Sequence, residues 1–325
     1  MDSFIKQAAG ACGWSTIAAV DGHSVAEYMT VRSGRGLGTA AINHRVRALK
    51  GFARWLVTNA RLARDPLAGV KLLNAGADRR IERRALEDDE LAALLDVAER
   101  SVSIAVPKPY RVARADGSKV LKTGWRHLRV PHRGALYLLA ASTGFRSGEL
   151  RSLTPRSFNL DAETPTVTFE AGYSKRRRRD VQPIRRDVAE ALRPVIDACG
   201  SSERIWAKAP DNLAPVIASD LRQARWAYVR HATDRDDRRR RVAFLRESSF
   251  LATVDDAGRK IDFHALRHTF ITRLARSGVT PTLARHGTIT LTMNRYSHVA
   301  LADTSKALDA LPVLTAGGRR NQRTL

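Results

Sequence analysis

The sequence predicts a mostly α-helical protein of the α+β class with one small β-sheet, and three observations support this prediction. Apolar residues recur at helical spacing in several segments of the 325-residue chain. Only two short runs have strand character, residues 164–170 (TPTVTFE), which alternate, and 180–184. The length and the 43% hydrophobic content suffice to bury real cores in roughly two domains.

The chain is strongly basic. It carries 56 Lys and Arg residues against 33 Asp and Glu, a net charge of +23, and 46 of the basic residues are Arg. An Arg-biased genome explains part of this excess, but not the shortage of acids. A folded chain with this charge indicates a polyanionic partner, and nucleic acid before membrane.

Several functional classes are excluded by what the sequence lacks. Its two cysteines, Cys12 and Cys199, are far apart, which excludes a disulfide framework or a Cys-based zinc module and fits a reducing cytoplasm. No apolar run has the length of a membrane span, and no signal peptide is evident. No Walker or GxGxxG loop occurs, so a nucleotide-driven motor is not expected.

Residues 1–77 form the first block, a set of short helices with a net charge of +6. The spacing predicts helices over residues 24–30 and 40–59. The polar face of the second helix is either a solvated surface or a DNA-facing one; it carries Arg45, Arg47, Lys50 and Arg54. Residues 74–84 (NAGADRRIERR) have no apolar period and read as a linker.

Residues 78–312 form the second block. The spacing predicts helices over residues 85–100, 134–142, 147–153, 187–198, 214–231 and 264–277. The two predicted strands would form a hairpin with residues 171–179 as its loop. Residues 232–241 (ATDRDDRRRR) read as an exposed loop, and residues 313–325 as a disordered basic tail.

Two motifs of the second block could bind an anion. In TGFRSGEL (residues 143–150), Arg146 lies at a helix start and Glu149 follows on the same face, where it could hold the guanidinium. In DFHALRHTF (residues 262–270), His264, Arg267 and His268 share one helix face. The two histidines could bind zinc, but no third ligand is evident; an Arg between histidines suits a phosphate.

Two further segments could contribute chemistry. Lys175 is the only lysine of the expected hairpin loop, and four arginines follow it that are either a solvated patch or contacts to a DNA backbone: Arg176, Arg177, Arg178 and Arg179. Near the C-terminus, LARH ends at His286 and NRYSH contains Tyr296. A tyrosine near histidine and arginine residues is a candidate nucleophile.

Taken in order, these motifs resemble the tyrosine recombinase (phage integrase) family, and most of all the integrases of bacterial mobile elements. The family signature is an Arg, a hairpin Lys, a His-x-x-Arg, a further His or Trp and a Tyr; the residues that match it are Arg146, Lys175, His264, Arg267, His286 and Tyr296. The resemblance covers about residues 40–311. It implies a helical, SAM-like core-binding domain at residues 1–77 and a catalytic domain at residues 78–312.

The resemblance implies a site-specific recombinase that cuts and rejoins duplex DNA. Tyr296 would attack a phosphodiester, form a 3′-phosphotyrosyl link and release a 5′-hydroxyl. Arg146 and Arg267 would clamp the non-bridging oxygens, and His286 would add a further donor.

Two residues would handle protons in this reaction. Lys175 would protonate the departing 5′-oxygen, while His264 would position or deprotonate the tyrosine. Because these cationic groups would do the electrostatic work and the covalent link would conserve the bond energy, no metal, ATP or other cofactor is implied. The implied partner is double-stranded DNA, which a homotetramer would bind at two sites in the cytoplasmic nucleoid. The resemblance leaves open whether an accessory DNA-bending factor takes part.

The sequence departs from the family pattern at two places. The segment between Gly278 and His286 is shorter than in related sequences by about one helical turn, roughly four residues. One alternative is therefore a catalytically impaired, DNA-binding integrase remnant, and another is a DNA-relaxing enzyme of the type IB topoisomerase kind. The first block looks truncated at its N-terminus, which predicts no separate arm-binding module.

Overall fold

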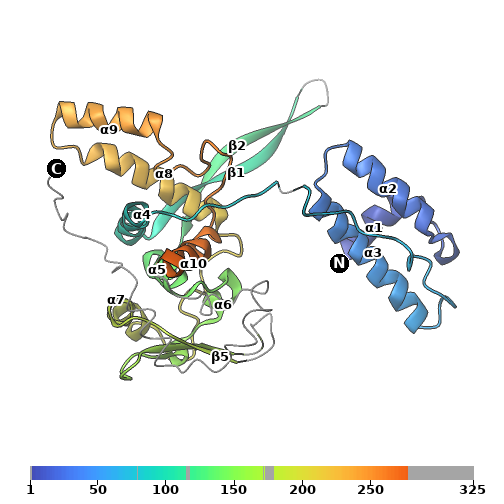
Figure 1. Cartoon of the computed structure of the whole chain (residues 1–325), viewed down its shortest axis with the longest axis horizontal. Helices are drawn as coiled ribbons and strands as arrows, with labels where there is room; N and C mark the ends of the chain where they lie inside the picture. Colours follow the sequence, from blue (N-terminus) through green and yellow to red (C-terminus); the bar gives the residue numbers. More distant parts are fainter. Residues whose placement is uncertain (1, 79, 115–117, 171, 173–178, 277–325) are drawn as a thin grey trace. The chain divides into compact units, whose positions relative to one another are not determined.

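The structure is a computed structural model that describes residues 2–78, 80–114, 118–170, 172 and 179–276. The chain divides into two compact units, Met1–Glu82 and Arg83–Leu325 (Figure 1). We call them unit 1 and unit 2. The division lies five residues later than the boundary expected after residue 77. Asp78 accepts the N–H of Thr39 at 2.7 Å and Arg80 donates to the carbonyl of Gly36 at 2.7 Å, which ties the start of the predicted second block to unit 1.

Unit 1 is helical. It contains α1 (Asp2–Ala11), a 3-10 turn at Ile17–Ala19, α2 (Gly22–Gly34) and α3 (Thr39–Thr58). The apolar stripe predicted for α3 is buried, since Ile42, Val46 and Leu49 have no exposed surface. The amide of the buried Asn43 donates to the carbonyl of Leu73 at 2.8 Å and accepts the N–H of that residue at 2.9 Å, which holds the segment after α3 against the helix.

Unit 2 combines seven α-helices with two small sheets among its described residues. The helices are α4 (Asp88–Arg100), α5 (Arg133–Thr143), α6 (Ser147–Ser152), α7 (Arg186–Asp197), α8 (Ala214–Arg230), α9 (Arg235–Glu247) and α10 (Ala265–Arg276). The α+β fold class expected from the sequence is therefore confirmed. Within the described residues, no helix is both long and apolar enough to span a membrane.

The start of α4 is a joint between distant parts of unit 2. Glu90 is buried and accepts the backbone N–H of Glu87 at 3.1 Å, which caps the helix. The guanidinium of Arg84 holds both oxygens of Glu90 at 2.6 and 2.7 Å. The backbone N–H of Leu251 donates to the same carboxylate at 2.6 Å, so one buried acid ties together the segments before α4 and α10.

A buried ion pair joins α5 to α8. The side chains of Arg133 and Asp220 have no exposed surface, and their closest contact is 2.9 Å. Tyr137 donates its hydroxyl to Asp220 at 2.8 Å, and Arg133 also donates to the carbonyl of Ser101. The charges are thus fully paired inside a predominantly apolar core.

The three-stranded antiparallel sheet has the order β3-β4-β5, with β3 at Phe158–Asn159, β4 at Thr166–Phe169 and β5 at Asp180–Pro183. β4 and β5 are the two strands that the sequence predicted. They pair from Thr166 opposite Pro183 to Phe169 opposite Asp180, so the chain between them, which contains Lys175, connects the ends of a hairpin.

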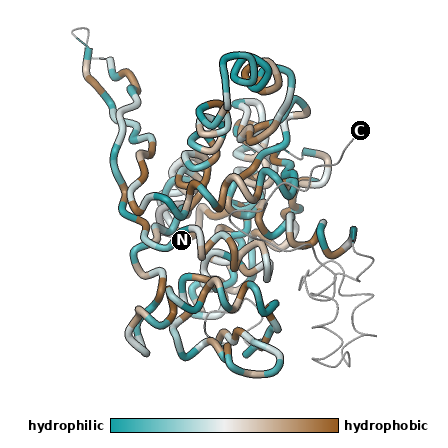
Figure 2. Tube along the Cα trace, turned by 90° about the vertical axis from the view of Figure 1, so that its left-hand side faces the viewer, coloured by the Kyte–Doolittle hydropathy of each residue, from teal (hydrophilic) through white to brown (hydrophobic). Residues whose placement is uncertain are grey.

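A second, two-stranded sheet was not predicted. β1 (Ser103–Ala113) and β2 (Lys119–Arg129) pair over eleven positions as a long antiparallel ribbon. Its base is anchored by Ile104 and Val106, which are buried in the core of unit 2. Its outer part extends away from the helices of the unit in both views (Figures 1 and 2).

The prediction of a loop over residues 232–241 was wrong. This segment contains the start of α9, which begins after Asp234 and packs against α8. The carboxylate of Asp234 accepts the N–H groups of Asp236 at 2.9 Å and Asp237 at 2.7 Å, an N-cap that starts the helix despite its arginine-rich sequence.

Candidate active site

The turn between α5 and α6 places Arg146. Gly144 ends α5 in the left-handed region with φ of +66°, which a residue with a side chain adopts only at a cost. The buried carboxylate of Glu149 accepts the backbone N–H of Arg146 at 2.9 Å and its guanidinium at 3.1 Å. The expected Arg146–Glu149 pair is therefore present, and the Arg146 side chain keeps 33% of its surface exposed.

Arg267 reaches the same turn from α10. Its Nη1 donates to the carbonyl oxygen of Gly144, two residues before Arg146. Arg267 is buried at 3% exposure, and Phe270, one helical turn further on, covers the α-carbon of Gly144. Two arginines that are 121 positions apart in the sequence are thus held at one turn.

His264 lies at the start of α10, beside several cationic groups. Its ring meets the ring of His268 edge to face at 5.5 Å between centroids. His264 keeps an exposed surface, yet partial desolvation of its ring, together with the charges of Arg83, His268 and Arg267, lowers its pKa from 6.5 to about 4. His264 is therefore neutral at pH 7 and can accept a hydrogen bond.

An ion pair that sequence reasoning missed supports this end of α10. Arg83 lies in the expected linker, yet its Nε donates to both oxygens of Asp262 at 2.9 and 2.8 Å. Asp262 also accepts the N–H of Ala265 at 3.2 Å. Burial alone would raise the pKa of Asp262, but the bonds and charge of Arg83 outweigh it and lower the pKa. The adjacent arginines of the predicted linker were the one sequence signal that could have indicated an ion pair here.

Gln182 connects the hairpin to the arginine turn. This buried residue of β5 donates its amide to the carbonyl of Thr143 at 3.0 Å. Phe145 and Phe169 pack edge to face at 5.0 Å, which brings β4 against the same turn. The hairpin whose connecting segment contains Lys175 is therefore fixed to the turn that carries Arg146.

The structure brings together three of the six signature residues, Arg146, His264 and Arg267. The other three, Lys175, His286 and Tyr296, lie outside the described residues, as does the short segment before His286. Within the described part of the chain, no group of three or more His, Cys, Asp or Glu side chains is arranged to hold a metal ion.

The four basic residues expected to face DNA on α3 have different surroundings. Lys50 donates to the carbonyls of Ala68 at 3.1 Å and Val70 at 2.7 Å, so its ammonium stabilises the segment after α3. Arg45 donates to the hydroxyl of Tyr28 at 3.2 Å. Arg47 and Arg54 are exposed, seven residues apart on one helix face.

Of the four arginines after Lys175, only Arg179 is described; Arg176, Arg177 and Arg178 lie outside the described residues. Arg179 pairs with Glu170 at 3.6 Å where both side chains are about two-thirds exposed, at 66% and 69%. An exposed pair of this kind contributes little to stability, so it does not hold Arg179 away from another partner.

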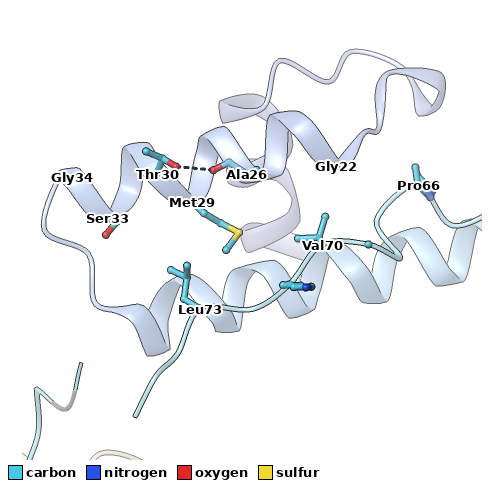
Figure 3. Close-up of a pocket in the computed structure, with 11 residues that line it drawn as sticks. Gly22, Ala26, Met29, Thr30, Ser33, Gly34, Pro66, Val70 and Leu73 are labelled. Atoms are coloured by element: carbon cyan, nitrogen blue, oxygen red, sulfur yellow. Dashed lines mark hydrogen bonds between the residues drawn. The ribbon is translucent and has the colours of Figure 1, made fainter. Parts of the chain in front are cut away.

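Unit 1 contains an open pocket of about 840 Å³. It lies between α2 and the segment after α3, with Met29, Val70 and Leu73 among its lining residues (Figure 3). Thr30 points its hydroxyl back to the carbonyl of Ala26 at 3.1 Å. None of the six signature residues lines it, so this pocket is not the candidate active site.

Two arginines with a neutral histidine beside them, on a small α+β scaffold, define a site suited to a phosphate oxyanion. The sequence model of the phage integrase family matches residues 121–302 of this chain. The chain belongs to the phage integrase family, as its ordered motifs predicted.

Individual relatives are distant. The tyrosine recombinase XerC of Xanthomonas campestris pv. campestris (strain B100) is 23% identical over 181 residues, which is 54% of this chain and 47% of that protein. The chain therefore spans about half the length of the curated relatives it matches.

Two solved structures are similar at lower identity. The Tn1549 transposon integrase, in complex with transposon right end DNA, is 17% identical, with 95% of this chain and 92% of that chain covered at a TM-score of 0.47. The integrase from mycobacterium phage Brujita is 16% identical, with 95% and 84% covered at a TM-score of 0.39.

Proposed function

We propose that this protein is a site-specific DNA recombinase of the integrase type, which cuts and rejoins duplex DNA through a 3′-phosphotyrosyl intermediate at the nucleoid. The observation that carries the proposal is the joint placement of Arg146 and Arg267 at the turn around Gly144. Arg267 donates to the carbonyl of Gly144 and Arg146 donates to the carboxylate of Glu149, and both guanidinium groups keep their positive charge at this turn. A phosphodiester bound there would meet positive charge where the transition state gathers negative charge.

The phenolic oxygen of Tyr296 loses its proton to solvent water and forms a bond to phosphorus, as the bond from phosphorus to the 5′-oxygen breaks. Lys175 gives a proton to that 5′-oxygen, and His286 donates to a non-bridging oxygen. Rejoining reverses the step with the 5′-hydroxyl of the same or a partner strand, so that a homotetramer on two sites exchanges strands.

The surroundings of His264 favour one of its two expected roles. A general base works best when its pKa is close to the working pH. His264, with a pKa of about 4, is a weak base at pH 7 but a competent hydrogen-bond acceptor. We therefore assign it the positioning of the tyrosine hydroxyl rather than its deprotonation.

Covalent trapping tests this proposal. The wild-type protein is incubated with a pool of nicked duplexes whose sequence is randomised around the nick, and DNA that stays bound after denaturation is recovered and sequenced. We expect adducts with wild type and none with Tyr296→Phe. Tyr228→Phe is the matched control, because this tyrosine of α8 has no proposed chemical role. Replacing Arg146 or Arg267 by Ala should lower the adduct rate by about 10²–10³.

The alternatives give different results in the same set of experiments. A remnant without catalysis would bind the duplexes but give no adduct with wild type. A relaxing enzyme would form the Tyr296 adduct and remove supercoils from a plasmid, without joining strands from two different duplexes. Recovery of joined strands, dependent on Tyr296, distinguishes the recombinase from both.

A further inference from the structure

The outer half of the β1–β2 ribbon, residues 108–113 and 119–124, has no buried residue on either face. An isolated two-stranded ribbon is marginally stable in water, so a long one is expected to serve a contact. At about 3.3 Å per residue this outer half extends about 20 Å. The match to the family model begins at residue 121, inside β2, so β1 and the turn lie outside the matched region.

The two strands of the ribbon are basic; Asp116, in the turn that connects them, lies outside the described residues. Residues 103–114 and 118–129 contain no Asp or Glu. They contain seven exposed basic residues for which the described part of the chain shows no ion pair: Lys108, Arg111, Arg114, Lys119, Lys122, Arg126 and Arg129. On α9, by contrast, Arg239 and Arg240 lie within 3.2 and 3.7 Å of Asp236 and Asp237.

Apolar side chains stand among these charges on both faces. The exposed fractions are 66% for Leu121, 61% for Trp125 and 47% for Tyr110. Arg111 lies opposite Leu121 on one face, and Tyr110 lies opposite Lys122 on the other. Figure 2 shows hydrophilic and hydrophobic residues interleaved along the ribbon. Such a surface suits duplex DNA, because cations can bind the backbone phosphates while aromatic and apolar groups contact the groove between the two backbones.

The ribbon is a poor template for another protein strand. Pro107 and Pro109 lie two residues apart on β1, within a register that continues through both. Since proline has no N–H and the ladder to β2 persists, their nitrogens face the open edge, where they prevent strand addition. A second copy would also present the same positive charge. The charge and the blocked edge together favour a nucleic acid over a protein partner.

We propose that the β1–β2 ribbon is a DNA-binding arm that contacts the backbone of duplex DNA with Lys108, Arg111, Lys119 and Lys122. A two-stranded ribbon fits the major groove, which is about 12 Å wide. The arm adds affinity and has no part in strand cleavage. It shares with the proposed function only the expectation that the chain binds DNA.

A salt titration tests the arm. The variant Lys108→Gln/Arg111→Gln/Lys119→Gln/Lys122→Gln and wild type are titrated with a fluorescein-labelled duplex of mixed sequence at several salt concentrations. Each lost phosphate contact lowers the slope of log affinity against log salt by about 0.9, so we expect the slope to fall by about 2–4. Affinity at low salt should fall at least about tenfold.

The matched control removes the same charge from α9, through Arg235→Gln/Arg238→Gln/Arg239→Gln/Arg240→Gln. These four side chains are also exposed. The arm is supported when the ribbon variant loses more affinity and slope than the α9 variant. Equal losses, or an unchanged slope in the ribbon variant, would overturn it. Circular dichroism of all proteins shows that the comparison is between folded chains.

Two further readouts separate this inference from its neighbours. Wild-type duplex binding without a covalent adduct would refute the proposed function and leave the arm standing, whereas adducts with unaltered salt dependence in the ribbon variant would refute the arm alone. The variant Leu121→Gln/Trp125→Ala tests the protein alternative by sedimentation. Weaker self-association with unchanged DNA affinity would identify a second copy as the partner and overturn the proposal.

Discussion

Replacing Gly144 by alanine should destabilise unit 2 through two separate effects. With φ at +66°, any L-residue at this position is strained by about 1–2 kcal/mol. The new β-carbon would also lie 2.8 Å from Cδ1 of Phe270, a ring with no exposed surface that has no room to move away. Overpacking of this kind adds about 1–3 kcal/mol. We expect a total loss of about 2–5 kcal/mol in the free energy of unfolding.

Gly148→Ala is the matched control, four residues along the same segment. Gly148 lies in α6, and no atom is within 4 Å of a β-carbon there. This variant should gain about 0.5–1 kcal/mol, because alanine favours a helix. Urea unfolding of the two variants measures the difference. Equal midpoints would show that neither the backbone conformation nor the contact with Phe270 constrains this turn. Gly144→Ala should also slow covalent adduct formation, since it shifts the carbonyl that holds Arg267.

Two further predictions concern buried and titrating groups. Asp220→Ala leaves Arg133 charged and unpaired in the core, so urea unfolding should show a loss of about 3–5 kcal/mol in the free energy of unfolding. The double variant Arg133→Met/Asp220→Leu should recover most of this loss. A loss below about 1 kcal/mol in Asp220→Ala would contradict the pairing. The folded pKa of His264, about 4, lies below its ordinary 6.5, so the unfolded chain binds the proton first and stability should fall as the pH drops from about 6.5 to about 4. His264→Gln should remove this part of the pH dependence of stability. Arg83→Gln should raise the midpoint of the His264 titration followed by NMR. A midpoint near 6.5 for His264 in the wild-type protein would refute the reasoning.

The helices were the most predictable part of the fold. The apolar stripe of residues 40–59 predicted α3, which begins one residue earlier and ends one residue earlier. The helix predicted over residues 85–100 ends where α4 ends, but α4 begins three residues later, at Asp88, because Glu87 and Glu90 form its capping box. Periodicity failed where burial does not set the pattern: α9 buries only Leu245, so its sequence has no apolar stripe to read.

The β1–β2 ribbon was missed for a related reason. Most of its residues are exposed on both faces, so no alternation appears, and Pro107 and Pro109 argue against a strand wherever they would break a ladder. Both prolines fit into β1 because their nitrogens face its open edge, where no ladder hydrogen bond is needed. Edge position is a property of the folded sheet, which a local sequence pattern does not contain.

The candidate site divides in the same way. The order and spacing of the motifs predicted Arg146, His264 and Arg267 as candidate site residues, and these three lie near one turn of the structure. Of the groups that hold them, Glu149 was predictable from its spacing to Arg146, whereas a carbonyl at Gly144 or an amide at Gln182 has no sequence signature. Arg83 was interpreted as part of a linker, since nothing nearby in the sequence indicates Asp262, 179 positions away.

The long sequence separations at the arginine turn have a consequence for how the protein is made. Arg267 bonds to a carbonyl 123 positions earlier, and Thr269 accepts the N–H of Leu86, 183 positions earlier. Contacts this far apart form late in folding, after the local helices. On the ribosome, α5 and α6 emerge long before α10 is synthesised. A nascent chain therefore presents Arg146 without Arg267, and the candidate site at this turn is assembled only once nearly the whole described chain has been translated.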